Sequence, residues 1–180
     1  MTQERPRDTP CLHVCPLSGV TGIADGLGRF DLLTLLSPDQ ARDDRRIRGS
    51  ERHLELSFHD ITEIRPGLVA PDRVIMQEIL DFARGARDHE MLIHCWAGIS
   101  RSSAAAYVIA CDRNPGFERD IANELRRRAP SVTPNRLMVA LADDLLDRNG
   151  RMTEAISRIG RGADAFEGEP YQLPLSWPIG

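Results

Sequence analysis

The residues best suited to chemistry form one short segment, residues 94–103, with the sequence HCWAGISRSS. Cys95 supplies a thiol directly after a short apolar run, and Arg101 supplies a guanidinium six residues later. Gly98 lies between them and permits a tight turn of the backbone. A thiolate that faces backbone N–H groups and a guanidinium is a nucleophile inside an anion-binding loop. We call residues 95–101 the cysteine loop.

The order of residue types places the cysteine loop between a strand and a helix. The apolar residues 91–93 predict a buried strand, and the small apolar residues 102–111 predict a helix buried on most sides. N–H groups at the start of that helix would bind an anion, and Arg101 would hold two of its oxygens with a planar guanidinium. The residues expected to contact a bound phosphate are Trp96, Ala97, Gly98, Ile99, Ser100 and Arg101.

These residue types suit attack by sulfur on a phosphate ester. In-line attack by Cys95 on phosphorus gives a cysteinyl-phosphate, which water hydrolyses in a second step. The loop N–H groups and Arg101 would stabilise the charge on the phosphoryl oxygens. Ser102 would donate a hydrogen bond to the sulfur and help it leave. The chemistry requires no cofactor, and the four cysteines lack the CxxC spacing of a zinc site.

The segment resembles the HCxxGxxR[ST] signature of the protein tyrosine phosphatase superfamily, and its AGISRS core is most similar to the dual-specificity branch. The resemblance implies that Cys95 is the nucleophile, that Arg101 binds phosphate and that Ser102 assists breakdown of the intermediate. It also implies that His94 supports the loop without contacting the substrate.

A second segment extends the resemblance. Residues 128–136, RAPSVTPNR, resemble the dual-specificity segment that ends in Pro-Asn before a final helix. The resemblance implies that Asn135 hydrogen-bonds within or beside the phosphate-binding loop. The alternative is that Asn135 is an ordinary residue at a helix N-terminus.

Cleavage of a phosphate ester also needs an acid that protonates the leaving oxygen. By the resemblance, this acid is an aspartate on a mobile loop some tens of residues before the cysteine. Asp60 lies 35 residues before Cys95, directly after an alternating segment that ends at Phe58. The alternative candidates for the acid are Glu63, on the same loop, and Asp72. Asp72 lies at the start of a predicted helix, where the helix dipole already explains an acidic residue. We call residues 60–70 the acid loop.

Strands and helices alternate along the chain. Strands are predicted at residues 12–17, 30–36, 53–58 and 91–93, and helices from residue 71, at 102–111, 117–128 and 134–147, and after residue 150. The helix from residue 71 is expected to bury Ile75, Ile79, Phe82 and Ala83. The charged residues 37–52 are predicted to form a solvated loop. This order predicts an α/β fold with a single domain and a central, largely parallel sheet flanked by helices, as in the protein tyrosine phosphatases.

The same pattern divides the chain into three parts. Residues 1–10 are expected to be flexible, residues 11–160 to form the phosphatase domain, and residues 161–180 to dock on it as a tail. The tail carries Phe166, Tyr171 and Trp177, which favour docking over free motion.

Composition sets further bounds. A chain of 180 residues with 41% hydrophobic content can bury one core. The net charge of −4 argues against a general nucleic-acid binder, although all 23 basic residues are arginine. The polar N-terminus lacks the apolar stretch of a signal peptide, and no run is long enough to cross a membrane. A cytoplasmic protein with reduced thiols is the expectation.

The predicted function is hydrolysis of phosphotyrosine in proteins, together with phosphoserine and phosphothreonine if the cleft is shallow. A phosphoinositide or inositol-phosphate phosphatase is the second hypothesis. It ranks lower because the variable loop positions Trp96, Ala97, Ile99 and Ser100 include no basic residue. A rhodanese-like sulfurtransferase is disfavoured by the spacing between Cys95 and Arg101. A phosphate-binding module without turnover is disfavoured because both of these residues are present.

Overall fold

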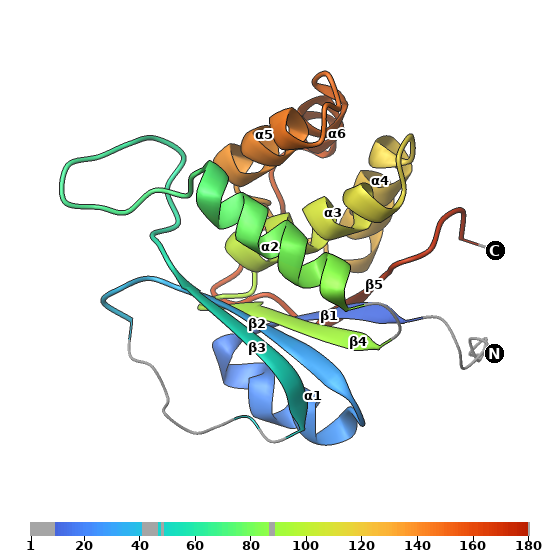
Figure 1. The fold of residues 1–180 in the computed structure, drawn as a ribbon. Coiled ribbons are helices and arrows are strands. Elements are labelled where there is room, and N and C mark those ends of the chain that lie inside the picture. Colours follow the sequence, from blue (N-terminus) through green and yellow to red (C-terminus); the bar gives the residue numbers. More distant parts are fainter. Residues whose placement is uncertain (1–9, 41–46, 48, 87–88, 180) are drawn as a thin grey trace.

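Five strands form the central sheet of the computed structural model, which describes residues 10–40, 47, 49–86 and 89–179 (Figure 1). The strands are β1 (Cys11–Pro16), β2 (Phe30–Leu36), β3 (Ser50–Ser57), β4 (Glu90–Cys95) and β5 (Tyr171–Pro174), in the order β3-β2-β4-β1-β5. The first four are parallel, and β5 is antiparallel to β1. The α/β fold with one domain and a largely parallel sheet is confirmed. The predicted flexible residues 1–9 lie outside the described part.

The burial of the strands follows from their place in the sheet. β1 and β2 are buried along their whole length, and β4 is buried from Met91 onward. Their continuous apolar runs fit strands that are covered on both faces. β3 is an edge strand with alternating exposed and half-buried residues, as its polar–apolar alternation indicates.

Helices cover both faces unequally (Figure 1). One face carries α2 (Arg73–Gly85), α3 (Arg101–Arg113), α4 (Glu118–Arg128), α5 (Arg136–Leu145) and α6 (Arg151–Ile159). The other face carries α1 (Val20–Gly26), which follows the short 3-10 turn η1 (Leu17–Gly19). The sequence pattern does not predict α1, because two glycines lower its helix propensity. Packing of Val20 and Ala24 in a small cluster with Phe30 and Leu92 stabilises it.

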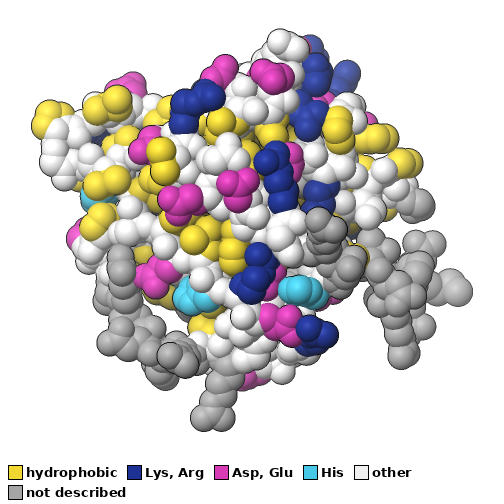
Figure 2. Space-filling view, in the orientation of Figure 1, with side chains coloured by type: hydrophobic (Ala, Val, Ile, Leu, Met, Phe, Trp, Pro, Cys, Tyr) yellow, Lys and Arg dark blue, Asp and Glu magenta, His cyan; other side chains and the backbone are white. Residues whose placement is uncertain are grey.

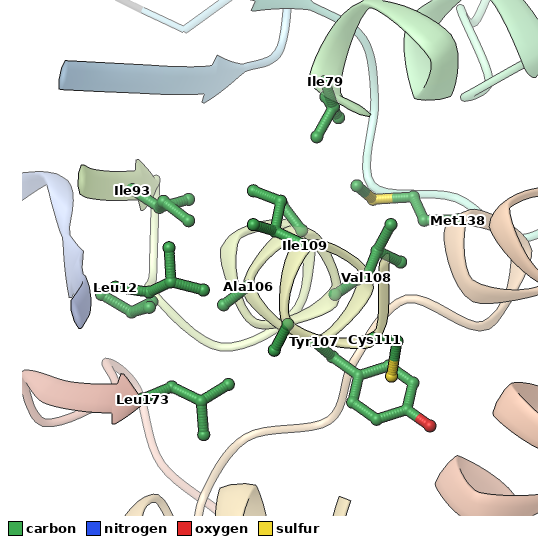
Figure 3. Close-up of a cluster of buried hydrophobic side chains, with 14 of the residues drawn as sticks. Leu12, Ile79, Ile93, Ala106, Tyr107, Val108, Ile109, Cys111, Met138 and Leu173 are labelled. Atoms are coloured by element: carbon green, nitrogen blue, oxygen red, sulfur yellow. The ribbon is translucent and has the colours of Figure 1, made fainter. Parts of the chain in front are cut away.

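The centre of the large core is α3. Eleven consecutive residues of this helix, from Arg101 to Cys111, are buried. Figure 3 shows it end-on between strand residues such as Leu12 and Ile93 and helix residues such as Met138. Its small residues allow the sheet and the neighbouring helices to approach closely. The start of α3 is therefore held firmly, and with it the end of the cysteine loop.

Two local predictions about the acid loop's neighbourhood need correction. The helix predicted from residue 71 begins at Arg73, with Asp72 as its N-cap and Pro71 before the cap. Its buried residues are Met76, Ile79, Leu80 and Ala83, whereas Ile75 and Phe82 are only partly buried.

The predicted solvated loop at residues 37–52 is wrong at both ends. Its last residues belong to β3, which begins at Ser50, and Ser37 is buried with 7% exposure. Residues 41–46 and 48 lie outside the described part.

The C-terminal segment contacts the rest of the domain at several points. β5 pairs with β1, the N–H of Gly162 donates to Thr133 Oγ1 at 3.0 Å, and the N–H of Gly168 donates to the carbonyl of Ala97 at 2.8 Å. Phe166, which was expected to favour docking, is instead 90% exposed. None of the helices in the described residues has the length and apolarity of a membrane span.

Candidate active site

The candidate site lies at one edge of the sheet, where the four parallel strands end. Cys95 is the last residue of β4 and pairs with Pro16, the last residue of β1. Ser37 directly follows β2, and Phe58 directly follows β3. In open α/β sheets, ligands bind beyond the carboxyl ends of the strands. The sheet thus brings four separate chain segments to one place.

The backbone of the cysteine loop is held from outside. The carbonyl groups of Trp96, Ala97, Ile99 and Ser100 accept hydrogen bonds from the N–H groups of Leu17, Gly168, Thr133 and Asn135, at 3.1, 2.8, 3.1 and 3.2 Å. In a trans peptide the C=O and N–H groups point in opposite directions. The N–H groups that follow these carbonyls are therefore turned to the inside of the loop, as an anion nest requires.

Gly98 is needed for this conformation. Its φ of 68° lies in the left-handed region, which residues with a Cβ disfavour. A Cβ at this position would lie 2.6 Å from the backbone nitrogen of Pro16. The cysteine loop therefore packs directly against the end of β1.

Cys95 lies at the base of the loop, buried, with its Sγ 3.2 Å from the Ser102 hydroxyl. The other thiols close to the site or to α3 are held in their protonated form. Burial, together with the nearby Cys95, raises the pKa of Cys15 to about 12. Burial also raises the pKa of Cys111. Cys15 packs in the small cluster beside α1, whereas Cys95 belongs to the large cluster on the other face of the sheet.

Arg101 is 4% exposed and is held by neutral acceptors. Its Nη1 donates to Ser37 Oγ at 3.0 Å and to the carbonyl of Phe58 at 2.8 Å, and its Nη2 donates to Gln40 Oε1 at 3.2 Å. Its buried Nε has no hydrogen-bond partner among the described residues. No carboxylate is among these hydrogen-bond partners in the described residues.

Ser37 and Gln40 support Arg101 although the sequence reasoning did not single them out. One signal is present, because Ser37 directly follows the carboxyl end of a predicted buried strand. The strongly charged residues after it hide that signal, since they favour a solvated loop for the whole segment. The Ser37 N–H also donates to Gln40 Oε1 at 2.7 Å, which closes the turn that carries both residues.

Asp60 is joined to the cysteine loop. Its Oδ1 accepts hydrogen bonds from Ser100 Oγ at 2.7 Å and from Asn135 Nδ2 at 2.8 Å. Asn135 is the N-cap of α5, and its side chain bonds the acid loop, not the cysteine loop. Its Oδ1 accepts from the Met138 N–H at 3.0 Å and caps α5, while its Nδ2 binds Asp60 and the carbonyl of Ile61.

The two rival acids have different surroundings. The Asp72 carboxylate accepts a hydrogen bond from the Ile75 N–H at 2.9 Å and caps α2. Glu63 is exposed within the acid loop. The ends of that loop are tied at His59, which pairs with Val69 through the His59 N–H at 2.7 Å and through its Nδ1 at 2.9 Å.

His94 directly precedes Cys95 in β4, and its side chain contacts the neighbouring strand β2. It is buried, and its Nε2 lies 2.8 Å from Thr34 Oγ1, which is also 2.9 Å from Nε2 of His53. Burial lowers the pKa of His94 to about 4, so the imidazole is neutral near pH 7. His94 therefore adds a hydrogen bond to the sheet edge without adding charge.

Comparison with known proteins defines the fold. No protein-family profile and no curated protein sequence matches the chain. Among solved structures, Tk-PTP in its active form superposes with a TM-score of 0.53 at 17% identity, over 78% of this chain and 92% of that one. A putative dual specificity phosphatase from mouse gives 0.52 at 17% identity, over 87% and 96%. The Yvh1 phosphatase domain from Chaetomium thermophilum gives 0.53 at 16% identity, over 82% and 96%.

These likenesses confirm the fold that the cysteine-loop signature implied. The chain has the fold of the cysteine-dependent protein tyrosine phosphatases, in its dual-specificity-like form.

Proposed function

We propose that this protein is a phosphatase that hydrolyses phosphotyrosine in proteins, and also phosphoserine and phosphothreonine, through a cysteinyl-phosphate. The observation that carries the proposal is the convergence of Cys95, Arg101 and Asp60 on one loop from β4, α3 and the segment after β3. These three side chains supply the nucleophile, the phosphate-binding cation and the acid that such a reaction needs. Asp60 comes from a segment 35 residues before Cys95, and a structural cysteine would not require a carboxylate beside its loop.

We assign the following roles, which the geometry supports. Cys95 attacks phosphorus in line, and the bond from phosphorus to the leaving oxygen breaks as Asp60 gives that oxygen a proton. Arg101 and the inward N–H groups hold the phosphoryl oxygens in both steps. In the second step the ionised Asp60 takes a proton from the attacking water, and Ser102 donates a hydrogen bond to the departing sulfur.

The surroundings of the loop favour an aromatic phosphate ester over a lipid with several phosphates. The side chain of Trp96 is 44% exposed beside the anion nest, and the acid loop exposes Ile64, Leu68 and Val69. In Figure 2 several apolar side chains lie at the surface of the projecting region where Figure 1 shows this loop, among polar groups. The variable loop positions carry no cation that could bind a second phosphate. We propose a reducing compartment such as the cytoplasm, because the nucleophile must remain a free thiolate.

The test is an assay of the purified protein on matched peptides that carry phosphotyrosine, phosphoserine or phosphothreonine. Phosphoinositides in vesicles and thiosulfate with cyanide are assayed in parallel. We expect release of phosphate that is fastest from phosphotyrosine and that Cys95→Ser abolishes. The control Cys111→Ala removes a thiol from the far part of α3 and should keep the activity.

Each outcome assigns a function. Preference for phosphoinositides would indicate a lipid phosphatase in place of a protein phosphatase. We include this assay because the fold is also similar to that of PTPMT1, which was solved in complex with PI(5)P. Thiocyanate formation would indicate a sulfurtransferase. Tungstate binding without any turnover would indicate a phosphate-binding module.

A further inference from the structure

Ser100 occupies the N-cap position of α3, yet its side chain makes no capping hydrogen bond. A serine at this position ordinarily accepts a hydrogen bond from the second or third N–H of the helix, which stabilises the helix. The Ser100 hydroxyl instead donates to Asp60 Oδ1 at 2.7 Å. Asn135, by contrast, caps its own helix with Oδ1 and keeps Nδ2 for Asp60. The backbone of Ser100 has φ −113° and ψ −69°, outside the extended region in which a serine caps a helix. Its hydroxyl is therefore available to Asp60.

The two donors act on the same oxygen. Ser100 Oγ and Asn135 Nδ2 both direct hydrogens at Asp60 Oδ1, at 2.7 and 2.8 Å. If the proton of Asp60 were on Oδ1, the Ser100 hydroxyl would have to turn from donor to acceptor, and the Asn135 amide would still face that oxygen. Both donations to Oδ1 are kept when the proton of Asp60 lies on Oδ2. Rotation of the carboxyl group about its bond to Cβ is opposed by the same two bonds.

We propose that Ser100 is a positioning residue that orients the general acid, so that Asp60 delivers its proton from Oδ2. The inference rests on the proposed phosphatase function. As sulfur bonds to phosphorus and the leaving oxygen departs with the electron pair of its broken bond, the Oδ2 proton passes to that oxygen. Asp60 is left ionised, and Ser100 and Asn135 continue to donate to Oδ1. In the hydrolysis step Oδ2 recovers a proton from the attacking water, so the charges balance over one turnover.

Ser100 also belongs to the loop, so its two roles must be separated. Its backbone carbonyl accepts the Asn135 N–H at 3.2 Å, and this bond does not depend on the hydroxyl. Loss of the hydroxyl should therefore leave the anion nest intact and disturb only the acid. When the general acid is wrongly oriented, hydrolysis of substrates with poor leaving groups becomes slower, whereas hydrolysis of substrates with good leaving groups hardly changes.

The experiment measures kcat/KM of Ser100→Ala on phenyl phosphate and on 4-nitrophenyl phosphate, whose leaving group is far more acidic. We expect a loss of about 10- to 100-fold on phenyl phosphate and under about 3-fold on the nitro compound. Ser100→Thr, which keeps a hydroxyl, should retain most of the parent's activity on phenyl phosphate. Added to Asp60→Asn, Ser100→Ala should cost less than about 2-fold more, because both substitutions remove the same function.

Two further measurements check the loop itself. Inhibition by tungstate should change by less than about 2-fold in Ser100→Ala if the nest is intact. The matched control is Ser18→Ala, since Ser18 also lies near the cysteine loop and donates to a carboxylate, Glu167, at 2.9 Å. This control should behave like the parent with both substrates.

Equal losses on the two substrates, or a Ser100→Ala loss that persists in the Asp60→Asn background, would overturn the positioning role while leaving the phosphatase function standing. Absence of Cys95-dependent hydrolysis in the parent would instead overturn the proposed function, and the role of Ser100 with it.

Discussion

The hydroxyl of Ser102 lies 3.2 Å from the sulfur of Cys95, on the first turn of α3. Ser102 is fully buried, so no bulk water competes with it for the sulfur. A hydroxyl at this distance can donate to a thiolate, and the donation stabilises the thiolate both before attack and as a leaving group. The contact therefore bears on the second chemical step as much as on the first.

Ser102→Ala should slow the breakdown of the cysteinyl-phosphate. Hydrogen bonds to charged groups contribute about 1.5–3 kcal/mol, so kcat should fall about 10- to 100-fold. Rapid mixing with 4-nitrophenyl phosphate should then show a burst of nitrophenolate near one equivalent, followed by slow turnover. A slow linear trace without a burst would place the effect of Ser102 on the first step instead.

Arg101→Lys should lower kcat/KM by at least about 100-fold, comparable with the loss of one oxyanion donor. An ammonium group cannot reach Ser37, the Phe58 carbonyl and two phosphate oxygens together. Inhibition by tungstate should weaken in parallel. The control is Arg158→Lys on α6, whose arginine pairs with Glu154 on the surface. Near-parental rates for Arg101→Lys would show that this guanidinium does not face the substrate.

Asp60→Asn should lower activity about 10²- to 10⁴-fold on a phosphotyrosine peptide and much less on 4-nitrophenyl phosphate. Asp72→Asn should keep the chemistry, because Asp72 caps α2 and asparagine is itself a good N-cap. Asp72→Ala should keep it too but lower the unfolding free energy by about 1 kcal/mol. The reverse pattern of activities would move the acid to Asp72.

Gly98→Ala should damage both the loop and the stability of the protein. The left-handed φ alone disfavours alanine by about 1 kcal/mol, and the added Cβ would meet the backbone nitrogen of Pro16 at 2.6 Å. Urea unfolding should show a lower midpoint, and tungstate should bind more weakly. Gly22→Ala is the control, since a Cβ on that glycine of α1 meets nothing within 4 Å. Equal stability of the two variants would mean that the loop can move away from β1.

His94 should make the protein less stable in mild acid. Its folded pKa of about 4 lies below the ordinary value of 6.5, so the neutral form is favoured by folding. The contribution of the neutral His94 imidazole to the free energy of unfolding is fully present above pH 6.5. It is lost as the pH falls toward 4, because the unfolded chain binds the proton first. By pH 5 the loss from this group is about 2 kcal/mol. In His94→Asn, the fall in unfolding free energy between pH 7 and pH 5 should be smaller by that amount. An unchanged pH dependence would mean that His94 titrates normally.

The chemistry of Cys95 and Arg101 was readable from the sequence because it is local. A strand, a glycine turn and a helix follow one another within a few residues, and the spacing of the two side chains fixes what the turn can bind. The strand at residues 30–36 was equally clear, since its apolar run ends at Ser37-Pro38. Asp60 could be proposed from its distance before Cys95 and from the strand that precedes it. The hydrogen bond between the Asp60 carboxylate and the cysteine loop could not be predicted from the sequence.

Tertiary structure decided the partners of these residues. Ser37 and Gln40 reach Arg101 only because β2 ends beside β3 and β4, and Ser100 and Asn135 reach Asp60 only because α5 starts next to the cysteine loop. Packing also formed α1 from a glycine-rich sequence and added β5 to the edge of β1. Hydrogen bonds of this kind join residues 40 to 75 positions apart. No local pattern encodes them, because they depend on which strand ends become neighbours when the whole core is buried.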